Sequence, residues 1–366
     1  MSGKYSSDPL WADVKPIPLD DGSKEGQEAT PLATIAYSPA YVEATSYLRA
    51  VMAANEVSER ALKLTQDVIS MNPAHYTVCL YVQYTDLARC RLYRAKILFA
   101  LNKNLDDELT WLNKVSLQYL KNYQIWHHRQ VIMSSRTAFP TLPPKELDFL
   151  MEMFAQDAKN YHVWTYRHWL VRHFNLWDSE REIRDVETLI NADVRNNSAW
   201  NHRYLLRFAP REGPEAGMPG GVISDQKGRS DVVDEELVDA ELDYAKEKIL
   251  LAPENRSPWL YARGVLRAAG RPLSEWKDFA SQFVTEEKTE DGQVVNVHVK
   301  SSLAVEWLAD VLGEEAQTEQ ESGKIAEAVK MLTLLKEKYD PIRRNYWDYR
   351  IRQLKDSTSE PVTASA

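Results

Sequence analysis

The stretch Asn122-Tyr-Gln-Ile-Trp-His-His-Arg129 decides the fold of this chain, because it occurs three times. The second copy runs from Asn160 to Arg167 and the third from Asn196 to Arg203, with Asn, Trp and Arg at the first, fifth and eighth positions. The tryptophans are 38 and 36 residues apart (164 − 126 and 200 − 164). A period of this size is typical of one helical hairpin per repeat. It predicts an all-α, tetratricopeptide-like solenoid in which each hairpin packs on its neighbours.

Length and composition agree with a solenoid. The chain has 366 residues, of which 44% are hydrophobic. A chain of this length is longer than a typical domain with a single compact core. Glycine is scarce, at 13 residues, while Leu, Ala, Glu and Lys are plentiful, which favours helix. The net charge of -9 argues against a nucleic-acid surface as the main function, although a local basic patch would be compatible with it.

Cysteine usage and hydropathy indicate the compartment. The two cysteines, Cys79 and Cys90, provide no disulfide framework and indicate a reducing environment. The N-terminus lacks the apolar core of a signal peptide, and no stretch approaches 18 uncharged apolar residues. We therefore expect a cytoplasmic protein without a transmembrane segment.

The chain divides into three predicted regions. Residues 1–39 contain five prolines and no helical period, so we expect an extended segment in which Trp11 is docked against another surface. Residues 40–354 are expected to form the helical repeat domain. Residues 355–366 have the composition of a disordered tail.

The repeat domain contains several irregularities. The motif preceding the first full copy is split around residues 79–91, which indicates an insertion, a gene-model error such as retained intron sequence, or a longer helix. A degenerate fourth motif contains Trp259, and its arginine, Arg263, lies one residue later than the motif position. Residues 212–231 are expected to form a loop, and residues 285–299 either a loop or a small hairpin.

The repeated Trp and Arg residues are predicted to be structural. A residue at the fifth position of the motif falls on the buried side of its helix, so we expect the tryptophans in the core: Trp126, Trp164 and Trp200. The arginines lie one turn further on the same side: Arg129, Arg167 and Arg203. A buried guanidinium needs a partner, and we expect carbonyls or acids of the next hairpin.

The start of each motif helix carries more functional information. Each motif Asn is a predicted N-cap and follows a cation, in order Lys121, Lys159 and Arg195. A cation opposes the dipole at a helix N-terminus by roughly 0.3–1 kcal/mol. Helix N-termini together with Lys or Arg attract phosphate, so this edge is a candidate anion site. The alternative is local neutralisation, because Asp157 and Asp193 lie just upstream of two of these cations.

The histidines do not form a recognisable metal site. They are numerous around the motifs, but none belongs to a His-Glu-x-x-His or Cys-x-x-Cys set. His127 and His128 point about 100° apart on a helix and cannot chelate together. We expect no metal bound by this chain, and we find no Gly-rich phosphate loop and no catalytic triad.

The motifs and their flanks resemble the α subunit shared by protein farnesyltransferase and protein geranylgeranyltransferase type I. The matching runs are Asn122–Arg129, Asp157–Trp164 and Asp193–Tyr204, and the N-terminal run Trp11–Pro18 is similar to the segment that precedes the repeats in that family. The resemblance covers most of residues 8–350. The split first motif and the worn repeat at Trp259 depart from the family pattern.

The resemblance implies a fold, a partner and a reaction. The fold would be a right-handed α-α superhelix, a crescent of about seven helical hairpins wrapped around a β subunit. Residues 1–39 would dock on that partner, which would hold the zinc, the isoprenoid pocket and most of the peptide site. Zinc and magnesium would act in the heterodimer. The reaction would transfer farnesyl or geranylgeranyl from its diphosphate to the Cys of a C-terminal Cys-a-a-X motif, in proteins such as small GTPases.

The resemblance also implies roles for particular residues. Lys159 would reach the diphosphate leaving group and stabilise its developing charge. Tyr161 and His162 would line the cleft that faces the substrate peptide, and Tyr123 holds the equivalent place one repeat earlier. Asn196 would lie near the diphosphate or the β subunit.

Two other functions are compatible with the sequence. A non-catalytic helical-repeat scaffold that binds peptides would fold alone and need no obligate partner. The related α subunit of Rab geranylgeranyltransferase is a second alternative. However, the animal members of that family carry extra domains, and the sequence of the third motif matches that family less well.

Overall fold

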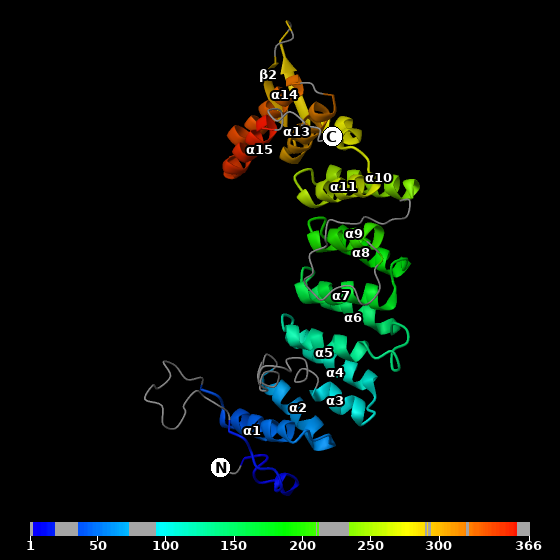
Figure 1. The fold of residues 1–366 in the computed structure, drawn as a ribbon, viewed down its shortest axis with the longest axis vertical. Helices are drawn as coiled ribbons and strands as arrows, with labels where there is room; N and C mark the ends of the chain where they lie inside the picture. Colours follow the sequence, from blue (N-terminus) through cyan, green and yellow to red (C-terminus); the bar gives the residue numbers. More distant parts are fainter. Residues whose placement is uncertain are drawn as a thin grey trace, which may run out of the picture. The chain divides into compact units, whose positions relative to one another are not determined.

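The computed structural model describes residues 3–18, 36–72, 93–209, 211, 234–289, 291, 294–319 and 322–356. Within these residues it has fifteen α-helices and a single pair of β-strands, which confirms the prediction of an all-α fold (Figure 1). The chain forms two compact units, Met1–Asn175 and Leu176–Ala366, and each is described by itself.

The first unit contains the first two copies of the motif. Its helices are α1 (Pro39–Ala53), α2 (Glu59–Met71), α3 (Tyr93–Ala100), α4 (Leu105–Gln118), α5 (Tyr123–Met133), α6 (Pro144–Gln156) and α7 (Tyr161–Phe174). The pairs α1/α2, α4/α5 and α6/α7 pack as hairpins, as Figure 1 shows. The motif helices α5 and α7 also contact each other, so the starts of two successive motifs belong to neighbouring helices.

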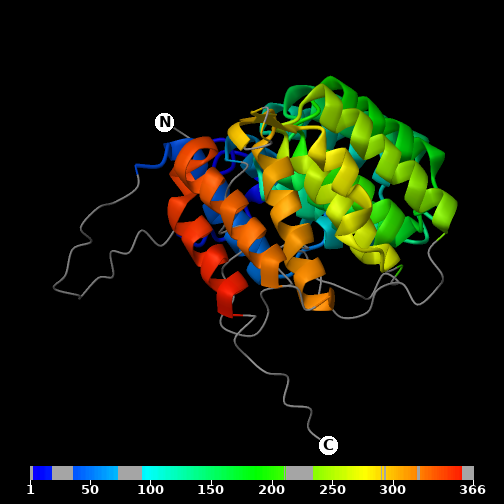
Figure 2. The ribbon, with the colours of Figure 1, turned by 90° about the horizontal axis from the view of Figure 1, so that it is seen from above.

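The second unit begins with the third motif. Its helices and strands are α8 (Glu180–Ala192), α9 (Asn197–Phe208), α10 (Glu235–Leu251), α11 (Arg256–Ala269), the 3-10 helix η3 (Leu273–Trp276), α12 (Lys277–Ser281), β1 (Val284–Lys288), β2 (Val294–Val299), α13 (Ser302–Glu319), α14 (Ser322–Leu334), the π-helix η4 (Leu335–Tyr339), the 3-10 helix η5 (Pro341–Arg343) and α15 (Arg344–Asp356). The pairs α8/α9 and α10/α11 are hairpins, and α9 contacts α11. Figure 2 shows α13, α14 and α15 side by side.

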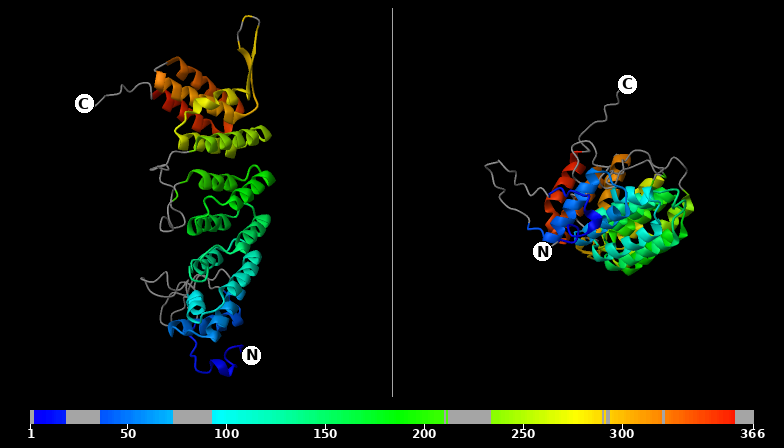
Figure 3. Two further views of the ribbon diagram at one scale, coloured as in Figure 1. Left: turned by 90° about the vertical axis from the view of Figure 1, so that its right-hand side faces the viewer. Right: turned by 90° about the horizontal axis from the view of Figure 1, so that it is seen from below.

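The segment predicted as a loop or a small hairpin forms a β-hairpin. β1 and β2 pair antiparallel, with a register shift between Glu287 and Lys288, and the hairpin projects from the second unit (Figure 3). Val284 and Val299 at its base pack against the cluster that surrounds Trp347. The hairpin is therefore anchored in the core of the second unit.

The motif helices begin where the sequence predicts caps. The side-chain oxygens of the motif asparagines accept hydrogen bonds from backbone N–H groups of the first turn, at Asn122, Asn160, Asn196 and Asn255. The first helices of several hairpins also start at polar caps: Asn104, Ser179 and Asp234. Capping satisfies N–H groups that the helix itself leaves without acceptors, so the sequence sets these starts locally.

The motif tryptophans lie in the core, as predicted. Trp126, Trp164 and Trp200 are 4%, 3% and 1% exposed. The Nε1–H of Trp164 donates to the carbonyl of Ala158 at 2.9 Å, and Trp200 makes the same bond to Val194. The indoles of Trp164 and Trp200 therefore tie their helices to the residue six places earlier, which belongs to the turn before the motif.

The N-terminal segment folds onto the first unit. Trp11 is buried against the rings of Tyr5 and Tyr47, which confirms that it is docked. Arg60 on α2 lies over the Trp11 ring and forms an ion pair with Asp13. Residues Pro9–Trp11 form the 3-10 helix η1, so the segment is not extended throughout. Docking of residues 1–39 on a partner subunit stays a prediction.

Some predicted features lie outside the described residues. These are Cys79, Cys90, the whole of the suspected insertion at 79–91, and the loop 212–231. The last helix continues to Asp356, two residues beyond the predicted end of the repeat domain, and the rest of the predicted tail is likewise outside the described part.

Candidate functional site

Three residues predicted to face a substrate gather at the starts of α5 and α7. The ring centroids of Tyr123 and His162 are 6.4 Å apart, and those of Tyr161 and His162 are 5.7 Å apart. Tyr161 is 67% exposed and Tyr123 is 36% exposed, whereas His162 is half-buried between them. These residues form a solvent-facing aromatic cluster in the first unit.

Asn160 holds the two helix starts together. Its side-chain oxygen accepts from the backbone N–H of His162 at 3.0 Å and of Val163 at 3.4 Å. Its Nδ2 donates to the carbonyl of Leu120, the residue before Lys121, at 2.8 Å. A single buried side chain therefore caps α7 and fixes its first turn against the turn that leads into α5. This explains why Tyr123 and His162 meet.

Lys159 and Lys121 lie next to this cluster in the chain, and both are exposed. Asp157 caps the end of α6, and its Oδ1 accepts from the backbone N–H of Lys159 at 3.2 Å. In the second unit, Asp193 accepts in the same way from the backbone N–H of Arg195 at 2.9 Å. Each bond positions the backbone that carries the cation and places a carboxylate beside it. Local neutralisation and anion binding are therefore both compatible with the surroundings of Lys159 and of Arg195.

Burial lowers the pKa of His162 below its usual value of 6.5. Burial disfavours the charged form of an imidazole, so the neutral form of His162 predominates at pH 7. A neutral imidazole can donate from one ring nitrogen and accept at the other. His162 can therefore bind a polar group of a ligand without adding positive charge to the site.

Asn196 occupies a different environment from the one predicted for a substrate-binding residue. Its side chain is fully buried, and its oxygen accepts from the backbone N–H of Ala199 at 3.3 Å as the cap of α9. A buried cap offers no side-chain surface to the diphosphate or to a β subunit, the two neighbours predicted for it. The geometry therefore favours a structural role for Asn196, in which it fixes the helix start that follows the exposed Arg195.

The motif arginines form ion pairs between successive hairpins. Arg129 on α5 makes two bonds, of 2.7 and 2.5 Å, to Glu146 on α6, and Arg203 on α9 makes bonds of 2.5 and 3.0 Å to Glu241 on α10. These contacts confirm that acids of the next hairpin are the partners of these two arginines. Arg167 is fully buried as well. Despite burial, the attraction of Glu146 raises the pKa of Arg129.

Sequence reasoning missed the glutamates that complete this network. They lie 18 residues before each motif Trp: Glu108, Glu146, Glu182 and Glu241. Each also bonds the residue two places after that Trp, at 2.7 to 2.9 Å: His128, Tyr166, His202 and Tyr261. Burial and the neighbouring Glu146 raise the pKa of Tyr166 well above 10, so it donates as a neutral phenol. The fixed offset between Glu and Trp could have revealed these residues in the sequence.

The described residues include neither a cluster of metal ligands nor a membrane-spanning helix. No group of three or more His, Cys, Asp or Glu side chains in that part of the chain is arranged to hold a metal ion. No helix among the same residues is long and apolar enough to cross a membrane.

Comparison with known proteins places the helical hairpins in a family. Residues 105–136, 143–174 and 179–208 match the family model described as Protein prenyltransferase alpha subunit repeat, and these ranges coincide with the hairpins α4/α5, α6/α7 and α8/α9. The protein farnesyltransferase/geranylgeranyltransferase type-1 subunit alpha of Candida albicans is 34% identical over 94% of this chain and 97% of its own length. The chain belongs to the prenyltransferase alpha-subunit family.

A solved structure extends this family assignment to the fold. The structure described as Candida albicans protein geranylgeranyltransferase-I complexed with GGPP matches with a TM-score of 0.72 and 34% identity, over 93% of this chain and 97% of that chain. This agreement confirms the predicted solenoid of helical hairpins. Mouse geranylgeranyl transferase type-2 subunit alpha is more distant, at 26% identity over 68% of this chain and 41% of its own length. The type-1 α subunits are therefore the better match.

Proposed function

We propose that this chain is the α subunit of a heterodimeric protein prenyltransferase. With a β subunit it transfers farnesyl or geranylgeranyl from its diphosphate to the Cys of a C-terminal Cys-a-a-X motif. The observation that carries this proposal is the 34% identity to the Candida albicans type-1 α subunit across 94% of the chain. The exposed cations and aromatic rings at the starts of α5 and α7 support a contribution to the site.

The proposed role of Lys159 is to stabilise the departing diphosphate. Cleavage of the isoprenoid–oxygen bond leaves negative charge on the diphosphate, and a fixed cation lowers the energy of that transition state. Lys159 is exposed and lies next to the capped start of α7, whose N–H groups add a positive field. Lys121 has the same place before α5 and is the natural second cation for this role.

Tyr123, Tyr161 and His162 are proposed to form one wall of the peptide cleft. Exposed tyrosines provide apolar contact area together with a hydroxyl for hydrogen bonding. The neutral His162 between them can bond a peptide carbonyl or amide. The β subunit would supply the remaining walls of the cleft, as well as the zinc and magnesium chemistry.

Co-expression with candidate β subunits from the same genome tests the proposal. We expect a stable heterodimer that contains zinc and prenylates a Cys-a-a-X peptide. If every candidate leaves this chain as an inert monomer, the proposal is wrong and a scaffold function is favoured.

Single substitutions test the cations. Lys159→Ala is expected to reduce turnover by roughly 10²–10³, the loss typical of one transition-state donor, while the heterodimer still assembles. Lys145→Ala is the matched control, because Lys145 is also exposed and also near a helix N-terminus, but belongs to α6. Unchanged turnover would remove Lys159 from the mechanism. A loss confined to Lys121→Ala would transfer the role to Lys121.

A further inference from the structure

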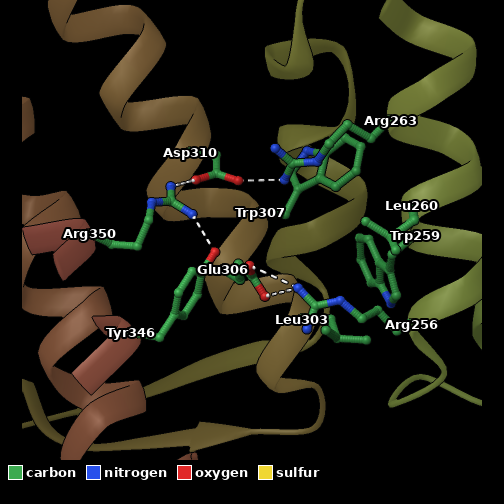
Figure 4. A pocket seen from close by; sticks show the side chains of 10 residues that line it. All are labelled: Arg256, Trp259, Leu260, Arg263, Leu303, Glu306, Trp307, Asp310, Tyr346 and Arg350. Atoms are coloured by element: carbon green, nitrogen blue, oxygen red, sulfur yellow. Dashed lines mark hydrogen bonds and ion pairs between the residues drawn. The ribbon is translucent and has the colours of Figure 1, made fainter. Parts of the chain in front are cut away.

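The second unit contains a cavity of about 200 Å³ between α11, α13 and α15 (Figure 4). Side chains from three helices that are far apart in the sequence line it. Pockets for drug-sized ligands and cofactors are usually about 300–1,000 Å³. The volume therefore suits one or two side chains of another polypeptide better than a whole small molecule.

The charged residues of this cavity leave a positive excess. Arg256, Arg263 and Arg350 line it together with two acids, Glu306 and Asp310, so the formal charge is +1. Figure 4 shows Arg263 and Arg350 reaching Asp310 from opposite sides, and both form ion pairs with it. One carboxylate thus serves two guanidinium groups. In the preceding repeat, by contrast, two arginines, Arg203 and Arg207, are matched by two acids, Glu187 and Glu241.

Arg256 is the guanidinium best placed to accept a further carboxylate. Its side chain is 44% exposed, and its two contacts with Glu306 are long, at 3.3 and 3.4 Å. Charge-assisted bonds of good geometry are normally about 2.7–2.9 Å, so this pair is weak and can be rearranged without great loss. An incoming carboxylate would bond Arg256 and neutralise the excess charge.

The cavity also offers apolar contact. Trp259 and Trp307 are 3% and 1% exposed and form part of its wall, while Leu260 at its edge is 49% exposed. Tyr346 on α15 lines the opposite side and is 37% exposed. Trp, Tyr and Arg are the residue types enriched in protein-interface hot spots, and Leu260 adds exposed apolar area beside them.

The repeat register places this cavity on a recognisable face of the motif helix. Arg256, Leu260 and Arg263 are four and three residues apart, so they share one face of α11. Arg256 is three residues before its motif Trp259, the position that Tyr161 holds before Trp164. The face of the repeat that exposes Tyr161 in the first unit therefore exposes Arg256 in the second.

We propose that this cavity is a docking site for the β subunit and receives a segment that carries an Asp or Glu beside an apolar side chain. The carboxylate bonds Arg256, and the apolar side chain packs on Leu260 and Tyr346. This inference rests on the proposed function, because it presupposes a β partner. It adds the location and the chemistry of one contact that holds the two subunits together.

Dilution of the heterodimer tests the docking site. Arg256→Glu and Leu260→Asp are expected to raise the subunit dissociation constant by about 30-fold, the effect of one hot-spot residue, as measured by the loss of prenyltransferase activity on dilution. High concentrations of β subunit should restore the wild-type turnover number, because neither residue acts in the reaction. Arg256→Lys, Leu260→Met and Arg184→Glu, an exposed arginine on α8, are matched controls with unchanged dissociation.

The outcomes separate this inference from the proposed function. If the wild-type chain forms no heterodimer, the proposed function fails. If the wild type assembles and both folded variants dissociate like it, the docking site is wrong. Arg256→Gln serves in place of Arg256→Glu if the latter lowers the thermal midpoint of the isolated chain. In addition, a photo-crosslinking residue at position 260 should capture a β-subunit peptide that contains Asp or Glu, and capture of residues of this chain alone would overturn the proposal.

Discussion

Asn160 shows how one side chain serves both the fold and the candidate site. Its oxygen caps α7, and its amide holds the carbonyl of Leu120, which adjoins Lys121. The Asn at the first position of the motif thus caps its own helix and also bonds the turn before the preceding motif helix. The residues that vary around it, such as Tyr161, carry the exposed chemistry.

Asn160→Ala is expected to destabilise the first unit by about 2–3 kcal/mol, as measured by urea denaturation. The lost cap accounts for about 1 kcal/mol, and the part-buried Leu120 carbonyl left without this donor accounts for the rest. Asn104→Ala is the control, because Asn104 is an exposed cap whose side-chain oxygen accepts from the N–H of Asp106. This variant should lose only about 1 kcal/mol of stability. Equal losses for the two variants would contradict the tie between α5 and α7.

At the scale of the helices, charged contacts link each hairpin to the next. Arg129 on α5 and Glu146 on α6 are almost fully buried and joined by two hydrogen bonds, and Tyr166 on α7 donates to the same glutamate. Buried ion pairs contribute little over an apolar contact, but removal of one partner leaves the other charge without compensation. The pair therefore favours one stacking of the hairpins over other packings.

Glu146→Gln is expected to destabilise the protein by about 3–5 kcal/mol, because Arg129 keeps its charge in a buried site. Glu180→Gln is the control: its side chain is 90% exposed and lies 3.6 Å from Arg184, so about 0.5 kcal/mol or less should be lost. The measurement is the urea denaturation of both variants, followed by tryptophan fluorescence. A loss below 1 kcal/mol for Glu146→Gln would show that the network does not hold the hairpins in register.

At the scale of the whole molecule, the proposed function divides the reaction between this chain and a β subunit. The described residues of this chain present cations and aromatic rings, but no cluster of metal ligands. The proposed function assigns the metal chemistry to the β subunit on the basis of the family resemblance. It follows that stability and activity should respond differently when metal is removed.

A zinc chelator is expected to abolish prenylation by the heterodimer and to leave the thermal midpoint of this chain alone unchanged. The physical reason is that a metal stabilises only the subunit that holds it and what that subunit binds. Calorimetry of the isolated chain with and without chelator, beside an activity assay of the heterodimer, provides the measurement. A drop of the midpoint for the isolated chain would place a structural metal here and contradict the division of roles.

The sequence by itself determined the helical repeats, their capped starts at residues such as Asn122, and the burial of Trp164. Caps and helical periodicity act over a few residues, so they can be read locally. Only the tertiary structure decided that Glu146 is the partner of Arg129, that Asn196 is buried, and that Arg256 borders a cavity. These facts depend on packing between helices that are distant in the sequence. The fixed offset between Glu and Trp marks the glutamates, but it does not say which arginine each of them bonds.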